Sequence, residues 1–542
     1  MAGPESQPSP RPVNDSADVT DDPSRVAPVP DRVDPDPGRD ARRQRRGRLA
    51  LAGAALLAAV LRLPAYFAAR HLTFDDGTFA SSVIAMRFGG VPFRQIFSSQ
   101  APLFLPLAYL GDTIGLHTMD SPRVIAVVSG VALVIFVHLA LRRSASSTAA
   151  LFGALLVGTS GCVMWVTAPL AADGPALAFA AAAFWLLLIH AENPRPLSAM
   201  LVGLTLGASL STKAMNVPLL IITAFVLALP FVNGLRARHL DLRLLRDPLV
   251  GASAALAVFL ASALPFGFAD VWDQAFRYRT ETSTDRDPLR NLAKVISTLW
   301  DRDLVLYLAT GVTIAWLIRR SLGSRVSTPG NDSPGGAAPA PASETPPWRA
   351  SPRALAGAWL VLTVLWLALG VNPLWRAHVS AVVLPLVLVL ALNAPPARWL
   401  LVLAVASLPL IPLQLHGLLP PGRYKGSERA VVELLRSLPP GAWAISDEPG
   451  LIWRADRRTT DFFVDPSVLR IQTGRYDEDD VISAAANERV CAVVVRSNAR
   501  FGSFPLLGQR LAALGYVVAQ TSTSRAGDAQ RVYVKAACSP PA

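Results

Sequence analysis

The chain has 542 residues, and its 51 basic and 39 acidic side chains give a formal charge of +12. Charged residues make up only 17% of the sequence and apolar residues 52%, and the mean hydropathy is +0.37. Soluble domains usually carry about 25% charged residues, so the composition excludes an ordinary water-soluble enzyme. Most arginines flank apolar runs, where membrane orientation accounts for them, so the positive charge does not indicate a nucleic-acid partner.

The apolar residues gather in runs of about 17–22, which is the length that crosses a hydrocarbon layer roughly 30 Å thick. The sequence therefore predicts a polytopic α-helical membrane protein with about eleven transmembrane helices. In chain order the predicted spans are 49–68, 122–141, 147–166, 174–190, 197–213, 216–233, 249–267, 303–319, 354–371, 377–394 and 399–416.

Residues 1–48 are predicted to form a disordered cytoplasmic N-terminus, since residues 1–40 are rich in Pro, Asp and Ser and almost free of aromatic residues. An arginine cluster between Arg42 and Arg48 then precedes the first span. That span is too long for a cleaved signal peptide, and the arginines place the N-terminus in the cytoplasm. An odd number of spans then places the C-terminus outside the plasma membrane.

Three segments interrupt the spans of the predicted transmembrane domain, residues 49–416. Residues 70–121 and 268–302 are predicted outer loops, and the first contains two apolar stretches that can lie along the membrane interface. Residues 321–352 are rich in Gly, Pro, Ala and Ser and are predicted to be a disordered cytoplasmic linker.

Residues 417–542 have a different character, because short helical segments alternate with β-branched strands. This pattern predicts a small extracytoplasmic α/β domain. Cys491 and Cys538 can form a disulfide there or stay free, whereas Cys162 lies inside an apolar run.

The strongest candidate for chemistry is the pair Asp75 and Asp76, just beyond the outer end of the first span. Adjacent carboxylates near hydrocarbon repel each other, which can raise the pKa of one of them, as a general base requires. The alternative interpretation is a helix cap followed by solvated charge.

Four further groups lie at outer ends of the predicted spans or in an outer loop. Asp173 precedes Pro175 and can instead be a helix-capping residue. Lys213 opposes the positive-inside trend, which suggests a phosphate partner, although a snorkelling lysine also fits. The last two groups are the segment Arg277, Tyr278 and Arg279, and the pair Arg376 and His378. Their side chains suit phosphate binding or stacking on a sugar, but they equally suit contact with membrane headgroups. The predicted topology brings all these residues to one outer face, as expected of a site that binds a lipid phosphate and activates a hydroxyl.

Several short motifs, in this order, resemble the GT-C superfamily of membrane glycosyltransferases, in particular the branch of protein O-mannosyltransferases and lipid A aminoarabinose transferases. The resemblance covers most of residues 49–395. The tail resembles soluble extensions of actinobacterial members in its Ser446-Asp447-Glu448-Pro449 and Phe463-Val464-Asp465-Pro466-Ser467 segments, and the Ala, Arg and Pro content suits such a source. The membrane-domain motifs are Arg62-Leu63-Pro64, Asp75-Asp76-Gly77, Gln100-Ala101-Pro102, Ser121-Pro122-Arg123, Ala172-Asp173-Gly174-Pro175, Lys213 after Gly203, and His378 before Leu384-Pro385-Leu386.

The resemblance implies an enzyme that transfers a hexose or pentose, with inversion, from a polyprenyl-phosphate donor to an acceptor hydroxyl on the outer face. Asp75 and Asp76 are then the catalytic residues, with Asp75 as the base. The implied phosphate-binding residues are Lys213, Arg279, Arg376 and His378, and the implied sugar- or acceptor-binding residues are Asp173, Gln100, Arg277 and Tyr278. No cofactor is required; a divalent ion held by Asp75, Asp76 and Asp173 is the second choice.

Two departures from the family pattern concern the site itself. The family usually has Asp-Glu where this chain has Asp75-Asp76, and its Gln-x-Pro-Pro element is shortened here to Gln100-Ala101-Pro102. The alternative functions are a lipid-linked sugar flippase and a membrane protein that binds cell-wall polymer. A flippase would place charges at mid-bilayer, whereas here they lie at the ends of spans. The sugar stays open (mannose, arabinose or another), as does the acceptor (glycan, lipid or protein).

Overall fold

The computed structural model describes residues 37–236, 238, 241–281, 287–324, 351–419, 426–524, 527 and 529–538. Contacts divide the chain into a short unit, Met1–Arg48, and a large unit, Leu49–Ala542. Helix α1 (Pro37–Tyr66) includes residues 37–48, which were expected to be disordered. The rest of the predicted disordered N-terminus and residues 325–350 of the predicted linker lie outside the described residues.

Every predicted span falls on a helix. Within the described residues, seven helical segments are long and apolar enough to cross a membrane, or eight if a pair bent by 59° counts as one span. That pair is α5 (Ser147–Thr159) and α6 (Gly161–Thr167). The polytopic helical fold is thus confirmed, while the count of eleven spans stays a prediction. The seven segments contain α1, α4 (Val124–Arg142), α7 (Asp173–Glu192), α9 (Val217–Arg236), α10 (Arg246–Ala263), α14 (Leu304–Ser324) and α15 (Pro352–Leu365).

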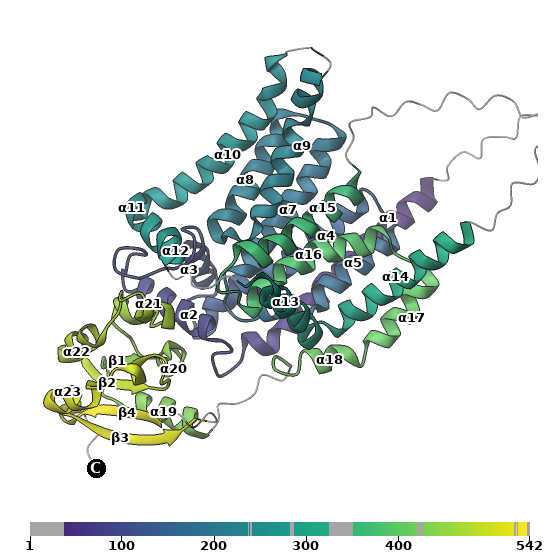
Figure 1. Ribbon diagram of the computed structural model, residues 1–542. Helices are drawn as coiled ribbons and strands as arrows, with labels where there is room; N and C mark the ends of the chain where they lie inside the picture. Colours follow the sequence, from purple (N-terminus) through teal and green to yellow (C-terminus); the bar gives the residue numbers. More distant parts are fainter. Residues whose placement is uncertain are drawn as a thin grey trace, which may run out of the picture. The chain divides into compact units, whose positions relative to one another are not determined.

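Three shorter apolar helices complete the predicted spans: α8 (Pro196–Thr212), α16 (Ser380–Leu392) and α17 (Ala397–Ser407). The last predicted span also includes α18 (Leu410–Gln414). Helices α8, α9 and α10 run beside one another (Figure 1). At Gly203 of α8, a Cβ atom would lie 2.1 Å from the carbonyl oxygen of Gly251 on α10. Small residues let these two backbones approach closely, as is typical of helix pairs in membranes.

Short helices form the two predicted outer loops. The first loop contains α2 (Phe74–Arg87) and α3 (Phe104–Ile114). The second contains α11 (Phe268–Val271), a π-helical turn (Trp272–Arg277), α12 (Tyr278–Glu281) and α13 (Pro288–Arg302). Helix α13 exposes Leu289, Leu292, Ile296 and Trp300 at helical spacing, so it has the apolar face of an interfacial helix.

The C-terminal region forms the expected α/β domain around a four-stranded sheet in the order β1-β2-β4-β3. Strands β1 (Trp443–Ser446) and β2 (Val490–Val495) are parallel, and β3 (Tyr516–Thr523) and β4 (Ala529–Lys535) complete the sheet in antiparallel pairings. Cys491 and Cys538 form a disulfide. This pairing settles the choice between the two expected cysteine states.

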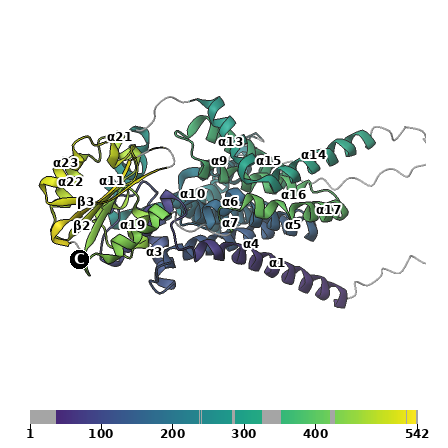
Figure 2. The ribbon, with the colours of Figure 1, turned by 90° about the horizontal axis from the view of Figure 1, so that it is seen from below.

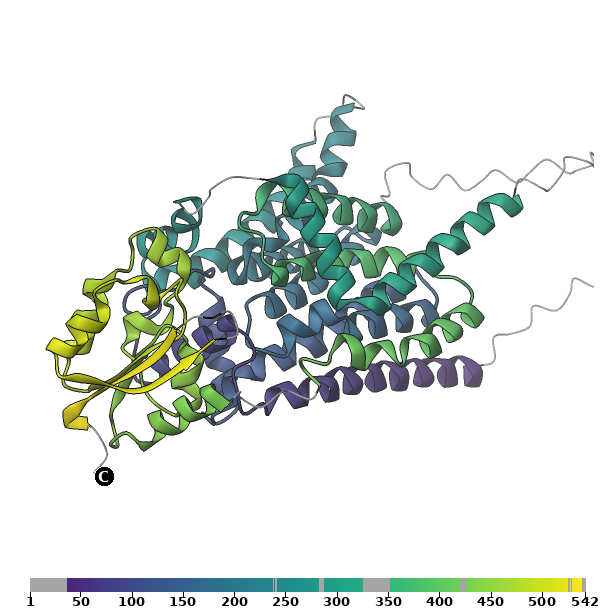
Figure 3. The same ribbon diagram turned by 60° about the horizontal axis from the view of Figure 1, so that its bottom comes forward.

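Helices pack on both faces of this sheet, and its central strand β2 is therefore buried on both sides. Helices α19 (Gly426–Ser437) and α20 (Pro449–Arg454) cover one face, and α22 (Glu478–Ala486) and α23 (Leu507–Ala513) cover the other. Figures 2 and 3 show the twisted sheet between these helices. Alternating side chains of one strand serve the two cores, with Ala492 and Val494 on one face and Val493 on the other.

Candidate active site

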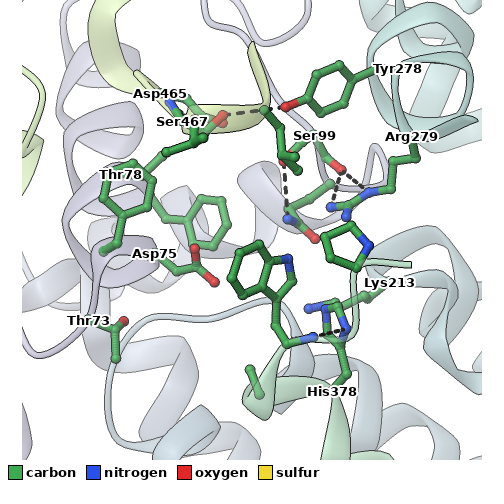
Figure 4. Close-up of a pocket in the computed structure, with 18 of the residues that line it drawn as sticks. Thr73, Asp75, Thr78, Ser99, Lys213, Tyr278, Arg279, His378, Asp465 and Ser467 are labelled. Carbon is green, nitrogen blue, oxygen red and sulfur yellow. Dashed lines mark hydrogen bonds between the residues drawn. The ribbon is translucent and has the colours of Figure 1, made fainter. Parts of the chain in front are cut away.

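The outer segments and the C-terminal domain enclose a cavity of about 640 Å³ (Figure 4). Residues that lie hundreds of positions apart in the chain face one another across it. The lining combines carboxylates, cations, hydroxyls and aromatic rings. It consists of Thr73, Phe74, Asp75, Thr78, Phe79, Ser99, Gln100, Lys213, Tyr278, Arg279, Pro373, Trp375, Ala377, His378, Asp465, Ser467, Val468, Leu469, Gln472 and Arg500.

Asp75 is the carboxylate of the first outer loop that faces this cavity. It lies in the first turn of α2, whose start is fixed by Thr73, because the Thr73 hydroxyl accepts a hydrogen bond from the Asp76 amide at 3.1 Å. The Asp75 side chain is open to the cavity, and no described residue forms a hydrogen bond with its carboxylate. Although the side chain is exposed to the cavity, desolvation by the surrounding protein raises the pKa of Asp75 to about 6; the charge of Lys213 opposes this shift, and the charges of Asp173 and Asp465 add to it.

Asp76 points away from the cavity and is fully buried against Arg123. The guanidinium donates to both carboxylate oxygens, at 3.1 and 2.5 Å, and the amides of Leu72 and Leu170 donate at 2.9 Å. Although burial opposes it, pairing with Arg123 lowers the pKa of Asp76 below its usual value. Asp76 therefore lies outside the cavity lining, paired with Arg123, and its predicted catalytic role stays a prediction.

Lys213 lines the cavity at the C-terminal end of α8. Its ammonium group lies 2.6 Å from a carboxylate oxygen of Asp173, and both side chains are buried. Asp173 does not line the cavity. Its carboxylate orients the Lys213 ammonium group and does not itself face the space in which a ligand would bind. The predicted snorkelling of Lys213 to the membrane surface is not what the structure has.

Four other predicted site residues also line the cavity: Gln100, Tyr278, Arg279 and His378. Arg279 donates two hydrogen bonds to the carbonyl of Ser99, at 3.0 and 3.3 Å, which hold its guanidinium in the wall. The Nδ1 atom of His378 accepts a hydrogen bond from the Trp375 amide at 3.3 Å. Fixed side chains of this kind are preorganised for a ligand.

Two predicted residues lie elsewhere. Arg277 is 66% exposed and pairs with Glu281 at 3.1 Å. Arg376 is 50% exposed and pairs with Asp301 at 3.0 Å. Neither side chain lines the cavity, because each turns from its short helical segment toward a carboxylate at the surface.

The C-terminal domain packs against the segment that carries Asp75. Glu448 lies 3.1 Å from His71 and accepts a hydrogen bond from Arg500 at 2.7 Å. The Arg500 guanidinium in turn lies 4.6 Å from the centre of the Phe74 ring. One turn later, a Cβ atom on Gly77 would lie only 2.6 Å from the Cα atom of Gly450, so the two backbones touch.

Sequence analysis did not assign the cavity residues of this domain to the site; they are Asp465, Ser467, Val468, Leu469, Gln472 and Arg500. A signal was present in the segment Phe463-Val464-Asp465-Pro466-Ser467, which contributed to the family resemblance. Nothing in the local pattern placed this segment beside Asp75, however, because that placement depends on how the domain docks.

The predicted alternative of a divalent ion held by Asp75, Asp76 and Asp173 does not fit this arrangement. Asp76 pairs with Arg123 and Asp173 with Lys213. Across the described residues, no group of three or more His, Cys, Asp or Glu side chains is placed to hold a metal ion. Asp76 and Asp173 therefore each have a separate partner, and the three carboxylates do not form one ligand set.

A family model described as dolichyl-phosphate-mannose-protein mannosyltransferase matches residues 99–267. No curated protein matches the sequence at a significant level. Two crystal structures of ArnT from Cupriavidus metallidurans resemble this chain, one in the apo state and one bound to undecaprenyl phosphate. Both have TM-scores of 0.56, with 14% and 13% identity, and both cover 91% of this chain and 98% or 99% of the other.

The Saccharomyces cerevisiae protein O-mannosyltransferase Pmt1-Pmt2 complex, bound to the sugar donor, matches 42% of this chain and 33% of its own, with 19% identity and a TM-score of 0.32. The ArnT matches extend over nearly the whole of both chains. The protein therefore has the fold of the ArnT structures, as the sequence resemblance to the branch that contains the lipid A aminoarabinose transferases predicted. The actinobacterial type stays a prediction.

The two adjacent aspartates are expected to respond differently to the same substitution. Asp76→Asn leaves the buried Arg123 guanidinium without its charge partner, which should lower the free energy of unfolding by about 3–5 kcal/mol. Asp75→Asn is the matched control, because that carboxylate has no partner to lose. The measurement is thermal unfolding of the full chain in detergent. An Asp76→Asn protein as stable as the control would contradict the structural role of Asp76.

Proposed function

We propose that the protein is an inverting membrane glycosyltransferase that moves a sugar from a polyprenyl-phosphate donor to an acceptor hydroxyl. The observation that carries this proposal is the separation of charge in one cavity. Asp75, which has no hydrogen-bond partner among the described residues, faces a space that also holds the cations Lys213 and Arg279. The ArnT fold adds support, and the ArnT structure with undecaprenyl phosphate suggests the class of donor lipid.

The cations suit the phosphate of such a donor. Charge-assisted hydrogen bonds to phosphate are about twice as strong as neutral ones, and they stabilise the charge that develops on a leaving phosphate. Lys213 is neutralised in part by Asp173 and Arg279 is held by Ser99. Both cations are therefore held in fixed positions in the wall of the cavity. His378 lies on the same side of the cavity (Figure 4).

Asp75 suits the role of the base. A carboxylate with a pKa of about 6 is mostly ionised at neutral pH and is more basic than an ordinary aspartate. It accepts the proton of the acceptor hydroxyl, whose oxygen bonds to the anomeric carbon. The bond between that carbon and the phosphate oxygen breaks, and its electron pair leaves with the polyprenyl phosphate. This single displacement inverts the anomeric centre.

The acceptor can be a glycan, a lipid or a protein, and the sugar a hexose such as mannose or a pentose such as arabinose. The family match to mannosyltransferases favours mannose among these. The site belongs on the outer face of the plasma membrane, because the Cys491–Cys538 disulfide of the C-terminal domain suits an oxidising compartment.

Asp75→Asn should abolish transfer by removing the base, a loss of about 100- to 10,000-fold, while binding of undecaprenyl phosphate stays unchanged. The readout is mass spectrometry of surface glycans and secreted glycoproteins from a deletion strain that expresses either form. A flippase or a wall-binding protein would tolerate this isosteric change, so normal products with Asp75→Asn would overturn the proposal.

The wild-type rate provides an internal check on Asp75. Because only the ionised carboxylate accepts a proton, transfer in membrane vesicles should decline as the pH falls through about 6. A profile that is flat from pH 5 to pH 8 would indicate that another group is the base.

Substitutions of two arginines in the same loop distinguish specific phosphate binding from a general effect of positive charge. Arg279→Gln should weaken the affinity of the full chain for undecaprenyl phosphate by about 10- to 100-fold, as expected for a hydrogen bond to a charged group. Arg277→Gln removes an equal charge outside the cavity and should leave affinity unchanged. Native mass spectrometry in detergent measures both, and equal effects of the two substitutions would show that Arg279 is not a specific phosphate ligand.

The orientation of the C-terminal domain is tested by labelling Cys538 in intact cells. A membrane-impermeant maleimide should react with Cys538 only after external reduction, because Cys538 is outside and oxidised, whereas Cys491 is buried in β2. Double substitution of these cysteines to serine is the control for background labelling. Protection of Cys538 until the membrane is permeabilised would place the domain in the cytoplasm.

A further inference from the structure

The cavity contains a second carboxylate, Asp465, that the proposed chemistry does not use. It lies in the C-terminal domain, is only 5% exposed, and faces the cavity. Among the described residues, Ser467 alone donates hydrogen bonds to its carboxylate, with the backbone amide 3.1 Å from Oδ1. A carboxylate has about four acceptor positions, so acceptor capacity is left for a ligand.

The turn that carries Asp465 is held rigidly. Buried Arg470 donates to the carbonyls of Phe462 and Asp465, at 3.1 and 2.7 Å. The same guanidinium lies 4.2 Å from the centre of the Phe97 ring, which belongs to the first outer loop. Asp465 is therefore fixed relative to α2 and does not lie on a free surface loop.

The polar groups labelled in Figure 4 divide into two sets, and Arg500 also lines the cavity, from the C-terminal domain. Asp75, Asp465, Ser467 and Thr78 lie on one side, and Lys213, Arg279 and His378 lie on the other. The charge of Asp465 acts on Asp75, so the two carboxylates influence each other. Two carboxylates that share a water-poor space repel each other. A ligand that donates O–H groups to them relieves that repulsion, whereas a second phosphate would increase it.

We propose that Asp465 and Ser467 form a subsite for the hydroxyl groups of a sugar ring, beside the base Asp75. The inference rests on the proposed transferase function and assigns the C-terminal domain a direct part in the site. Neighbouring ring hydroxyls can donate to the free carboxylate positions of Asp465 and exchange hydrogen bonds with the Ser467 hydroxyl, which lies 3.4 Å from the hydroxyl of Tyr278. Hydrogen bonds from hydroxyls to a carboxylate are short and strong.

The sugar ring can come from either of two substrates. It belongs to the donor if Asp465 holds the sugar that is transferred, and to the acceptor if the acceptor is itself a glycan. The chemistry of recognition is the same in both cases, so the subsite is defined by its ligand class, and the experiment separates the two sources.

The test compares Asp465→Asn with Asp461→Asn in the full chain. Asp461 belongs to the same segment but does not line the cavity, which makes it the matched control. Asp465→Asn should reduce the product detected by mass spectrometry in the complemented deletion strain by about 10- to 100-fold. Its thermal stability and affinity for undecaprenyl phosphate should equal those of Asp461→Asn, because neither measurement involves a sugar.

A second measurement uses Asp75→Asn as a trap, since this protein should bind the donor without turning it over. Native mass spectrometry of the purified trap identifies the lipid that accompanies it. Loss of the sugar-bearing lipid on adding Asp465→Asn, but not Asp461→Asn, assigns the subsite to the donor sugar. Retention in both, together with the loss of product, assigns it to the acceptor.

Product at the control level in Asp465→Asn cells would overturn the subsite while leaving the transferase proposal intact. Normal product in Asp75→Asn cells would overturn the transferase proposal itself. If Asp465→Asn fails to fold, Ser467→Ala takes its place, and it should lower product at least threefold with unchanged stability. Full activity of a stable Ser467→Ala protein would then count against the subsite.

Discussion

The buried ion pair between Asp76 and Arg123 is the constraint on which the site depends. It ties the beginning of α2 to the segment before α4, and Arg123 also donates to the carbonyls of Ala65, Tyr66, Ala68 and Arg70 at the end of α1. Consecutive residues of a helix point about 100° apart. Once Asp76 is turned into the protein, Asp75 must point elsewhere, and it points into the cavity. The ion pair thus fixes the direction of a side chain that it never touches.

The cavity brings cations and carboxylates together but holds them in different ways. Lys213 and Arg279 each have a partner that orients them, whereas the Asp75 carboxylate has none among the described residues. Paired cations stay in place to meet an anion, and an unpaired carboxylate stays able to take a proton. This arrangement matches two substrates. One is a donor whose phosphate leaves beside the cations, and the other is an acceptor whose hydroxyl gives its proton to the carboxylate.

The C-terminal domain is built into the site. Trp453 and Arg454 of α20 contact the first outer loop at Met119 and Asp120, and Arg475 pairs with Asp273 and Glu281 of the second. The domain therefore forms hydrogen bonds and ion pairs with both loops that line the cavity. Movement of this domain would displace Asp75 and Asp465 together, because one set of contacts positions both.

The sequence alone determined the transmembrane helices and the α/β tail, because apolar runs and strand alternation are local properties that each segment displays by itself. It also pointed to Asp75, Lys213, Arg279, Tyr278 and His378, whose charge or aromatic character is unusual at the ends of spans or in their connecting loop. Gln100 was found only through its motif in the family resemblance. Only the tertiary structure decided that Asp76 pairs with Arg123 away from the cavity, that Arg277 and Arg376 face the surface, and that Asp465 lines the cavity. Those outcomes depend on which way a side chain turns and on where a distant domain docks, and both are set by contacts between segments far apart in the chain.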